Sequence, residues 1–291
     1  MITKYALRFG AAVALALAAT TAHAEYKEAW RASGFLMPES VAYDRSSGAF
    51  FVSNINSSQF QANGEGYVFQ IDAAGKVVKE KFVAGLNAPK GIDIAGNRLF
   101  VAGIEELVEV SLPSGEIVQR YKAPGATFLN DVSVAPDGRV FVSETMQSAI
   151  YVLENGSLKE WLKDPKLAGA NGVYISGNSL FVALLGDLSQ GFQNVKPSNV
   201  KVVDLGTRAI TDFGSAEPVG VLDGLEPMPG GSSFVVTDNP GGRLIAVAPD
   251  GGQTVLAMPG PGAADHEIAA DKKLVVIPMT RTGEVIGYTI E

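Results

Sequence analysis

The chain has 291 residues, of which 46% are apolar and 8% aromatic, enough to bury a sizeable core and to speak against disorder. It contains no cysteine and only two histidines, His23 and His266, which excludes thiol chemistry, disulfides, iron–sulfur centres and Cys-ligated zinc. A formal net charge of -8 and the lack of any basic run argue against a nucleic-acid partner.

The first 24 residues have the pattern of a secretory signal peptide. Lys4 and Arg8 give a positive start, residues 10–19 form a short apolar run, and Ala22-His23-Ala24 matches a small-x-small cleavage site. The apolar run is too short to span a bilayer, and no cysteine follows it to carry a lipid. We therefore expect a periplasmic or secreted protein without membrane insertion, in which residues 1–24 are removed and residues 25–291 form a single domain.

The rest of the chain repeats one unit six times. Each unit begins with a polar residue and continues with an apolar strand, a turn and a second apolar strand; further runs such as 66–82, 107–121 and 149–162 supply two more. The opening residues, which lie 51, 40, 41, 52 and 42 residues apart, are Glu39, Lys90, Asn130, Asn171, Asp223 and Asp265. Four short strands per unit at this spacing predict an all-β fold, a six-bladed β-propeller, rather than a jelly roll or sandwich.

The last unit is one strand short. It contains strand-like runs at 274–279 and 285–291, but no fourth run follows them. We expect residues 25–35 to supply the missing strand, because this would join the termini and remove an open sheet edge.

The shared phase of the repeat places the six opening residues around one mouth of the central channel. Four of them, in blades 1, 3, 4 and 5, carry the oxygen donors that hard divalent cations prefer. One histidine and no cysteine make a zinc site of ordinary composition less favourable. The alternative is turn chemistry, since Asn171-Gly172 and Asp223-Gly224 are also turn dipeptides.

Four segments carry a resemblance to a known family, and they are Pro38-Glu39-Ser40-Val41, Leu129-Asn130-Asp131, Ala170-Asn171-Gly172-Val173 and Leu222-Asp223-Gly224-Leu225. In this order and at this spacing they resemble the metal-site motifs of the gluconolactonase, senescence-marker-protein and luciferin-regenerating-enzyme family. Members of that family are six-bladed propellers, and the resemblance covers residues 38–288.

The resemblance implies a set of roles. One divalent cation would be held by Glu39, Asn171 and Asp223, with Ca²⁺ expected and Mg²⁺, Mn²⁺ or Zn²⁺ left open. Asn130 would lie beside the cation and orient water or substrate, and Asp223 would also be the candidate catalytic base. The partner would be a small-molecule lactone or ester.

Two positions depart from the family pattern. Sugar-lactone members carry an Arg just before the third-blade Asn, whereas residues 126–129 here read Ala-Thr-Phe-Leu. Phe128 in this stretch therefore has two interpretations. It contacts a ligand more apolar than a sugar lactone, or it is an aromatic residue of the core. The ammonium of Lys90 would repel a cation unless it is paired. We expect it to pair with Asp265, although it could instead replace the cation or bind a substrate carboxylate, and we interpret Lys90, Phe128 and Asp265 as substrate-binding residues.

Two further features bear on the mouth of the channel. His266 could act as a proton shuttle, but its neighbour Asp265 has the channel phase, so we expect His266 to point into the blade. The two long repeats contain polar insertions at 53–66 and 185–199, each with one phenylalanine, Phe60 and Phe192. These insertions are specificity loops or solvated connections, and the sequence does not fix which mouth they cover.

The sequence thus favours a periplasmic metal-dependent hydrolase of a lactone or related ester. The competing hypothesis is a non-catalytic propeller that binds a small ligand or a protein partner at the channel mouth. The main support for this competing hypothesis is the absence of the family Arg and the presence of Lys90.

Overall fold

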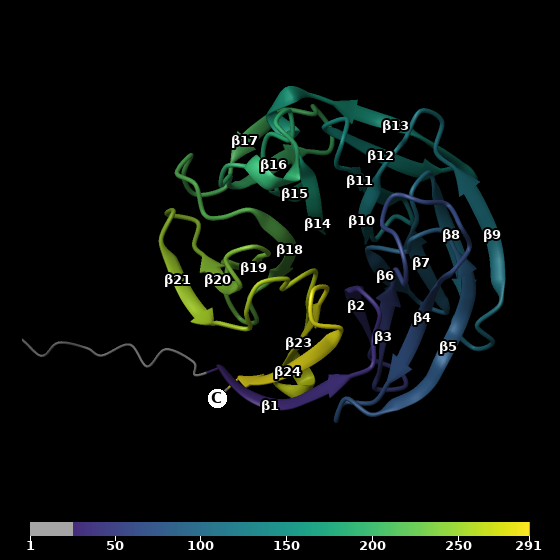
Figure 1. Ribbon diagram of the computed structural model, residues 1–291. Helices are drawn as coiled ribbons and strands as arrows, with labels where there is room; N and C mark the ends of the chain where they lie inside the picture. The colour runs from purple at the N-terminus through teal and green to yellow at the C-terminus, as the bar shows by residue number, and fades with distance from the viewer. Residues whose placement is uncertain (1–25, 291) are drawn as a thin grey trace, which may run out of the picture.

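The computed structural model describes residues 26–290, and the predicted signal peptide at residues 1–24 lies outside them. The described chain forms six four-stranded antiparallel sheets, which are arranged as blades around a central channel (Figure 1). The six-bladed β-propeller predicted from the repeats is therefore confirmed. No helix in residues 26–290 is both long and apolar enough to cross a membrane.

Each of the first five blades uses four strands that are consecutive in the chain. Blades 1 and 2 consist of β2 (Pro38–Asp44), β3 (Ala49–Asn54), β4 (Gly66–Ile71), β5 (Val77–Leu86), β6 (Ile92–Ala95), β7 (Arg98–Ala102), β8 (Glu106–Ser111) and β9 (Ile117–Lys122). Blades 3 and 4 consist of β10 (Leu129–Val134), β11 (Val140–Glu144), β12 (Ala149–Glu154), β13 (Ser157–Lys163), β14 (Ala170–Ser176), β15 (Ser179–Leu184), β16 (Val200–Asp204) and β17 (Ile210–Asp212). Blade 5 consists of β18 (Leu222–Pro227), β19 (Phe234–Asp238), β20 (Arg243–Val247) and β21 (Gln253–Ala257), and the connections contain the short 3-10 helices η1 (Pro165–Leu167), η2 (Phe192–Asn194) and η3 (Ala270–Lys272).

The sixth blade joins the two ends of the described chain. Its strands are β22 (Glu267–Ala269), β23 (Leu274–Met279), β24 (Glu284–Ile290) and β1 (Tyr26–Ser33). β1 runs antiparallel along β24 as the outermost strand, as Figure 1 shows. The prediction that the N-terminal segment completes the last blade is confirmed for residues 26–33, and Glu25 lies outside the described residues. Trp30 of β1 also donates from Nε1 to the carbonyl of Ala73 in blade 1 at 2.9 Å.

The core of the described residues consists of six large apolar clusters, one between each pair of neighbouring blades, and a small seventh cluster of Ile55, Ala88 and Ile104. Each blade is packed on both faces, so its middle strands are apolar without alternation; β3, for example, is buried along its whole length. The outermost strands are mostly exposed, and in β13 only Leu158 and Trp161 are buried. The repeated unit is thus a sheet that buries its surface only between two copies of itself.

Four of the six inner strands are irregular where they reach the channel mouth. In β10 the register with β11 shifts between Leu129 and Val132, so that Asn130 and Asp131 form a bulge. β2, β14 and β18 shift at the matching point. A bulge changes the direction of the side chains it contains. The polar residues that mark the repeat in the sequence are therefore the residues that the bulges turn toward the channel.

Candidate functional site

Five of the six predicted ring residues line one cavity at the channel mouth, which we call the mouth cavity and which has a volume of about 580 Å³. They are Glu39, Lys90, Asn130, Asn171 and Asp223, and Phe128 lines the same cavity. All six side chains are buried. The structure therefore brings together, from five blades, most of the residues that the sequence singled out.

Asp265 is the exception, and its predicted position on the ring is wrong by one residue. Two backbone hydrogen bonds show this. The N–H of Ala264 donates to the carbonyl of Pro278, which is the bond that Lys90 makes to Ala102 in blade 2. The N–H of Asp265 donates to the carbonyl of Glu39, which is the bond that Gly91 makes to Asn130. Ala264 is thus the ring residue of blade 6. Asp265 holds the second bulge position and lines a separate, deeper cavity of about 300 Å³, the channel cavity, where its Oδ2 accepts from Ser40 Oγ at 2.5 Å.

Glycine at the second bulge position lets neighbouring inner strands approach each other. Gly91, Gly172 and Gly224 occupy this position in blades 2, 4 and 5. A Cβ atom on Gly172 would lie 2.4 Å from the carbonyl oxygen of Asp223, and one on Gly224 would lie 2.5 Å from Oδ1 of Asp265. The dipeptides Asn171-Gly172 and Asp223-Gly224 are therefore explained by close packing around the channel.

Three buried oxygen atoms of the mouth cavity have no hydrogen-bond partner among the described residues. They are Oε2 of Glu39, Oδ1 of Asn130 and Oδ1 of Asp223. Asn130 is held by its other end, since Nδ2 donates to Thr145 Oγ1 at 2.9 Å. Asp223 is held through Oδ2, which accepts from Nδ2 of Asn239 at 2.7 Å. Asn130 and Asp223 are thus each fixed at one atom and leave an acceptor free in the same cavity as Oε2 of Glu39.

This donor set fits a hard divalent cation, which takes carboxylate and amide oxygens as ligands. An unsatisfied buried acceptor is costly, and one cation bound between the three oxygens would satisfy all of them at once. Within residues 26–290 no three histidine or acidic side chains are placed to hold a metal, so amide oxygens would have to contribute. Asn171 lines the cavity and hydrogen-bonds to Asp223, so its predicted role as a ligand remains a prediction.

The carboxyl groups of the mouth cavity hold protons more tightly than exposed ones. Burial raises the pKa of Asp223 to about 7, although hydrogen bonds from Asn239 and Asn171 oppose this shift. Burial also raises the pKa of Glu39 well above its usual value; the nearby charges of Asp223 and Asp265 add to the shift, and that of Lys90 opposes it. A bound cation would favour the ionised form of both groups.

Lys90 lies at the base of the mouth cavity with only 1% of its surface exposed. Its Nζ donates to the carbonyl of Ala88 at 3.2 Å and lies 4.3 Å from the centroid of the Phe128 ring. Burial lowers the pKa of Lys90 to about 8, while Glu39 and Glu144 oppose the shift. The expected pairing with Asp265 is replaced by these contacts, because Asp265 lies deeper in the channel.

Phe128, Phe60 and Phe192 form one group, which we call the aromatic cluster. Their ring centroids are separated by 5.4 Å for Phe60 and Phe128, 5.9 Å for Phe60 and Phe192, and 6.1 Å for Phe128 and Phe192. Both insertions therefore cover the same mouth as the polar ring, a point that the sequence left open. Phe128 is 4% exposed and lines the mouth cavity, so it is buried as a core aromatic would be, and its role toward an apolar ligand stays a prediction.

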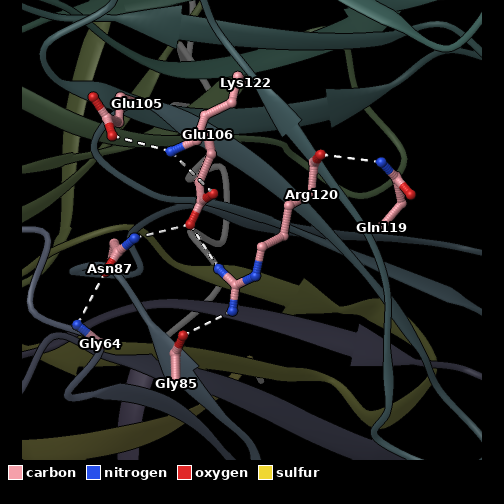
Figure 2. A network of polar contacts seen from close by, with 8 residues as sticks. All are labelled: Gly64, Gly85, Asn87, Glu105, Glu106, Gln119, Arg120 and Lys122. Atoms are coloured by element: carbon pink, nitrogen blue, oxygen red, sulfur yellow. Dashed lines mark hydrogen bonds and ion pairs between the residues drawn. The ribbon is translucent and has the colours of Figure 1, made fainter.

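A polar network fixes the insertion that carries Phe60 (Figure 2). Buried Glu106 accepts at Oε1 from Asn87 Nδ2 at 2.9 Å and from Arg120 Nη1 at 2.6 Å. Oδ1 of Asn87 in turn accepts from the backbone N–H of Gly64 at 3.0 Å, and Arg120 Nη2 donates to the carbonyl of Gly85 at 2.8 Å. The base of this loop is thus bonded to blade 2.

His266 points into the blade, as predicted. It is 1% exposed, and neither ring nitrogen has a hydrogen-bond partner among the described residues. Burial lowers its pKa to about 3, so the imidazole is neutral at physiological pH. It lies one position after Asp265, where the inner strands of the other blades carry apolar residues such as Val132 and Val173. A role for His266 as proton shuttle at the mouth is not supported by this placement.

The channel cavity contains acidic residues that the sequence reasoning missed. It is lined by five carboxyl side chains, those of Asp93, Asp131, Glu226, Asp265 and Glu267. Three of them follow the ring residue of their blade by three positions, when Ala264 is taken as the ring residue of blade 6; they are Asp93, Glu226 and Glu267. The inner-strand phase could therefore have located them. Burial raises the pKa of Asp93 to about 6 and that of Glu267 to about 7.

No protein-family model and no curated protein matches this sequence. Among solved structures, a gluconolactonase from Xanthomonas campestris is similar over 89% of this chain and 88% of its own, with a TM-score of 0.68 and 15% identity. The calcium-binding protein regucalcin from Agrobacterium tumefaciens is similar over 91% and 95%, with a TM-score of 0.67 and 14% identity. A catalytically inactive histidine variant of virginiamycin B lyase from Staphylococcus aureus is similar over 92% and 100%, with a TM-score of 0.59 and 13% identity. The chain thus shares the six-bladed propeller fold of gluconolactonase- and regucalcin-like proteins, as the sequence resemblance predicted.

Proposed function

We propose that this protein is a metal-dependent hydrolase of a lactone or a related ester, with its active site in the mouth cavity. The observation that carries the proposal is the set of three unpartnered oxygens, from Glu39, Asn130 and Asp223, that line one cavity. The fold shared with a gluconolactonase and with calcium-binding regucalcin supports the same reading.

Glu39, Asp223 and an amide oxygen of Asn130 or Asn171 would hold the cation, which we expect to be Ca²⁺, with Mg²⁺, Mn²⁺ and Zn²⁺ as alternatives. When bound, such a cation polarises a carbonyl oxygen and lowers the pKa of water. Asp223 accepts a hydrogen bond from Asn239 at Oδ2 and has Oδ1 free to take a proton from the attacking water. A general base is most effective with a pKa near the working pH, and burial places that of Asp223 at about 7.

The remaining residues would position the substrate. Thr145 holds the amide of Asn130 so that Oδ1 faces the cavity, where it can orient water. The ammonium of Lys90 offers a positive charge for a carboxylate of the substrate or product. The imidazole of His266 is buried in the blade and gives no support to a histidine-dependent reaction at this site.

We also propose that the protein is exported to the periplasm or secreted, which N-terminal sequencing of the cell-free fraction would test.

The hydrolase proposal is tested with the mature protein, its bound metal measured, and a panel of lactones and esters assayed with and without a chelator. Asp223→Asn keeps an acceptor for Asn239 but removes the base and one anionic ligand, and we expect it to lower kcat by roughly 10²-fold or more. Asp250→Asn, in an exposed turn, is the matched control. Turnover that survives both the chelator and Asp223→Asn would contradict the proposal. Ligand retention without turnover would favour the non-catalytic binding propeller.

A further inference from the structure

Two large aromatic side chains are exposed at the mouth of the channel. Phe60 is 56% exposed and Phe192 38%, and both lie against Phe128. Phe128 and Phe192 line the mouth cavity, and Phe60 packs on both of them. They come from insertions in two blades that are not neighbours, blade 1 and blade 4. Exposed apolar side chains that are scattered need no explanation, but a contiguous group at the rim of a cavity marks a ligand-contact surface.

The mouth cavity is largely apolar on the side of these insertions, although Gln59 and Gln193, the neighbours of Phe60 and Phe192, also line it. Ile55 and Leu185, the residues that lead into the two insertions, line it, and so do Val195, Met37 and Val221. The aromatic cluster contributes no hydrogen-bonding group, and the arginine that lines the mouth cavity, Arg281, comes from blade 6 and not from residues 126–129. A polyhydroxylated substituent packed on the aromatic cluster would lose more hydrogen bonds to water than the amides of Gln59 and Gln193 could replace.

The aromatic cluster is held in place from two directions. The carboxylate of Glu144 accepts from the backbone N–H of Thr127 at 3.0 Å and from that of Phe128 at 2.8 Å. The network of Asn87, Glu106 and Arg120 fixes the base of the loop that carries Phe60, as Figure 2 shows. A rigid apolar surface loses little conformational entropy when a ligand binds, so its contact area is converted to affinity efficiently.

We propose that the aromatic cluster is the subsite for an apolar substituent of the substrate, which is therefore a lactone or ester bearing an alkyl or aryl group rather than a sugar lactone. The inference rests on the proposed function for the identity of the reacting group. Phe60 and Phe192 are then specificity-determining residues, and the carbonyl to be attacked lies toward Asn130 and Asp223 at the other side of the same cavity.

The test is a series of γ-lactones whose alkyl substituent lengthens from methyl to hexyl, with glucono-δ-lactone as the polar counterpart. Binding is measured by calorimetry on Asp223→Asn, and kcat/KM on the otherwise unchanged protein. We expect the Kd for Asp223→Asn to fall roughly fourfold for each added methylene that reaches the cluster. The variant Phe60→Ala/Phe192→Ala, with both changes at exposed positions, should reduce this increment to less than about twofold. In the variant Val78→Ala/Met258→Ala, which removes apolar groups that are 60% and 65% exposed elsewhere, the increment should not change.

The outcomes separate the two proposals. Chain-length increments that depend on Phe60 and Phe192, in a protein that hydrolyses none of the compounds, would support the subsite and overturn the hydrolase. Hydrolysis that ignores chain length or prefers glucono-δ-lactone would support the hydrolase and overturn the subsite. Increments that persist in Phe60→Ala/Phe192→Ala would also overturn the subsite.

Discussion

At the scale of single residues, Lys90 controls the electrostatics of the mouth cavity. The residue is 1% exposed, and its buried ammonium raises the free-energy cost of placing a second positive charge beside it. We predict that Lys90→Met, which keeps the length of the side chain, increases the affinity for Ca²⁺ by on the order of tenfold. The titration is made at pH 7, where Lys90, with a pKa of about 8, still carries its charge in most molecules of the parent protein. Loss of Lys90 also raises the pKa of Glu39, and the protons that Glu39 then holds oppose part of the gain.

Lys79→Met is the control for this prediction. The Lys79 ammonium also lies over a phenylalanine ring, 5.1 Å from the centroid of Phe82, but on an outer strand. It should leave the Ca²⁺ affinity unchanged. A Lys90→Met protein that binds Ca²⁺ no more tightly than the parent would show that Lys90 does not act on the cation site.

The single-residue predictions from the sequence succeeded where the repeat fixed the phase. Glu39, Asn130, Asn171 and Asp223 reached one cavity because each begins a bulge in the same register. Asp265 did not, because the ring residue of blade 6 is Ala264, an apolar residue that a search for polar positions passes over. The predicted pairing of Lys90 with Asp265 failed for the same reason, because Asp265 lies one residue deeper in the channel than the ring. Only the backbone hydrogen bonds between blades reveal this difference.

At the scale of elements, the bulges require close contact between adjacent inner strands. A methyl group on Gly172 would lie 2.4 Å from the carbonyl oxygen of Asp223 and 2.9 Å from the backbone nitrogen of Leu225. We predict that Gly172→Ala lowers the free energy of unfolding by about 1–3 kcal/mol, because β14 and β18 must separate. It should also weaken cation binding, since Asp223 moves with β18.

Urea unfolding of Gly172→Ala and of Gly231→Ala would check this prediction. Gly231 lies in a turn, and its added Cβ would have no neighbour nearer than 3.9 Å, so this variant controls for the change of residue type. Equal stability of the two variants would mean that the inner strands separate without cost at this point.

The insertion that carries Phe60 depends on the network in Figure 2. We predict that Asn87→Ala lowers the free energy of unfolding by roughly 1 kcal/mol, because Gly64 loses its acceptor and Glu106 loses a donor. Amide hydrogen exchange should become faster in residues 55–65 and stay unchanged in β10 and β14. Asn97→Ala, at an exposed turn, is the control. Unchanged protection of residues 55–65 would show that other contacts hold the loop.

These insertions could be located from the sequence but not placed. The two long spacings identified them, because extra residues in a regular repeat must lie in a connection. Which mouth they cover depends on the order of the strands within a blade, and this becomes visible only through the contacts of Phe60 and Phe192 with Phe128.

At the scale of the whole molecule, the repeat determines the architecture. Six units with apolar middle strands can bury those strands only against one another, and a closed ring of six satisfies every unit. The N-terminal strand was predictable for the same reason, since the last unit lacked an outer strand and β1 supplies it. The carboxyl groups inside the channel follow from the same closure, because each inner strand contributes a side chain to the axis.

These carboxyl groups make the stability of the fold depend on pH. The folded protein raises the pKa of Asp93 to about 6 and that of Glu267 to about 7, so it retains protons that the unfolded chain releases above about pH 4. Stability therefore falls as pH rises through these values, by about 1.4 kcal/mol for each unit of pKa shift in each group. His266 acts in the opposite direction, because its pKa is lowered from 6.5 to about 3, but its contribution is complete above pH 6.5.

We therefore predict that the free energy of unfolding, measured in urea with a chelator present, is lower at pH 8 than at pH 6.5. Glu267→Gln removes one buried titrating group and should reduce this difference, whereas Glu116→Gln, in an exposed turn, should not. Ca²⁺ should stabilise the protein more at pH 8 than at pH 6.5, because it competes with protons for Glu39 and Asp223 at the mouth of the same channel. A stability that rises between pH 6.5 and pH 8 without metal would mean that the channel carboxyl groups are already ionised, and that a cation or water compensates their charge in the folded protein.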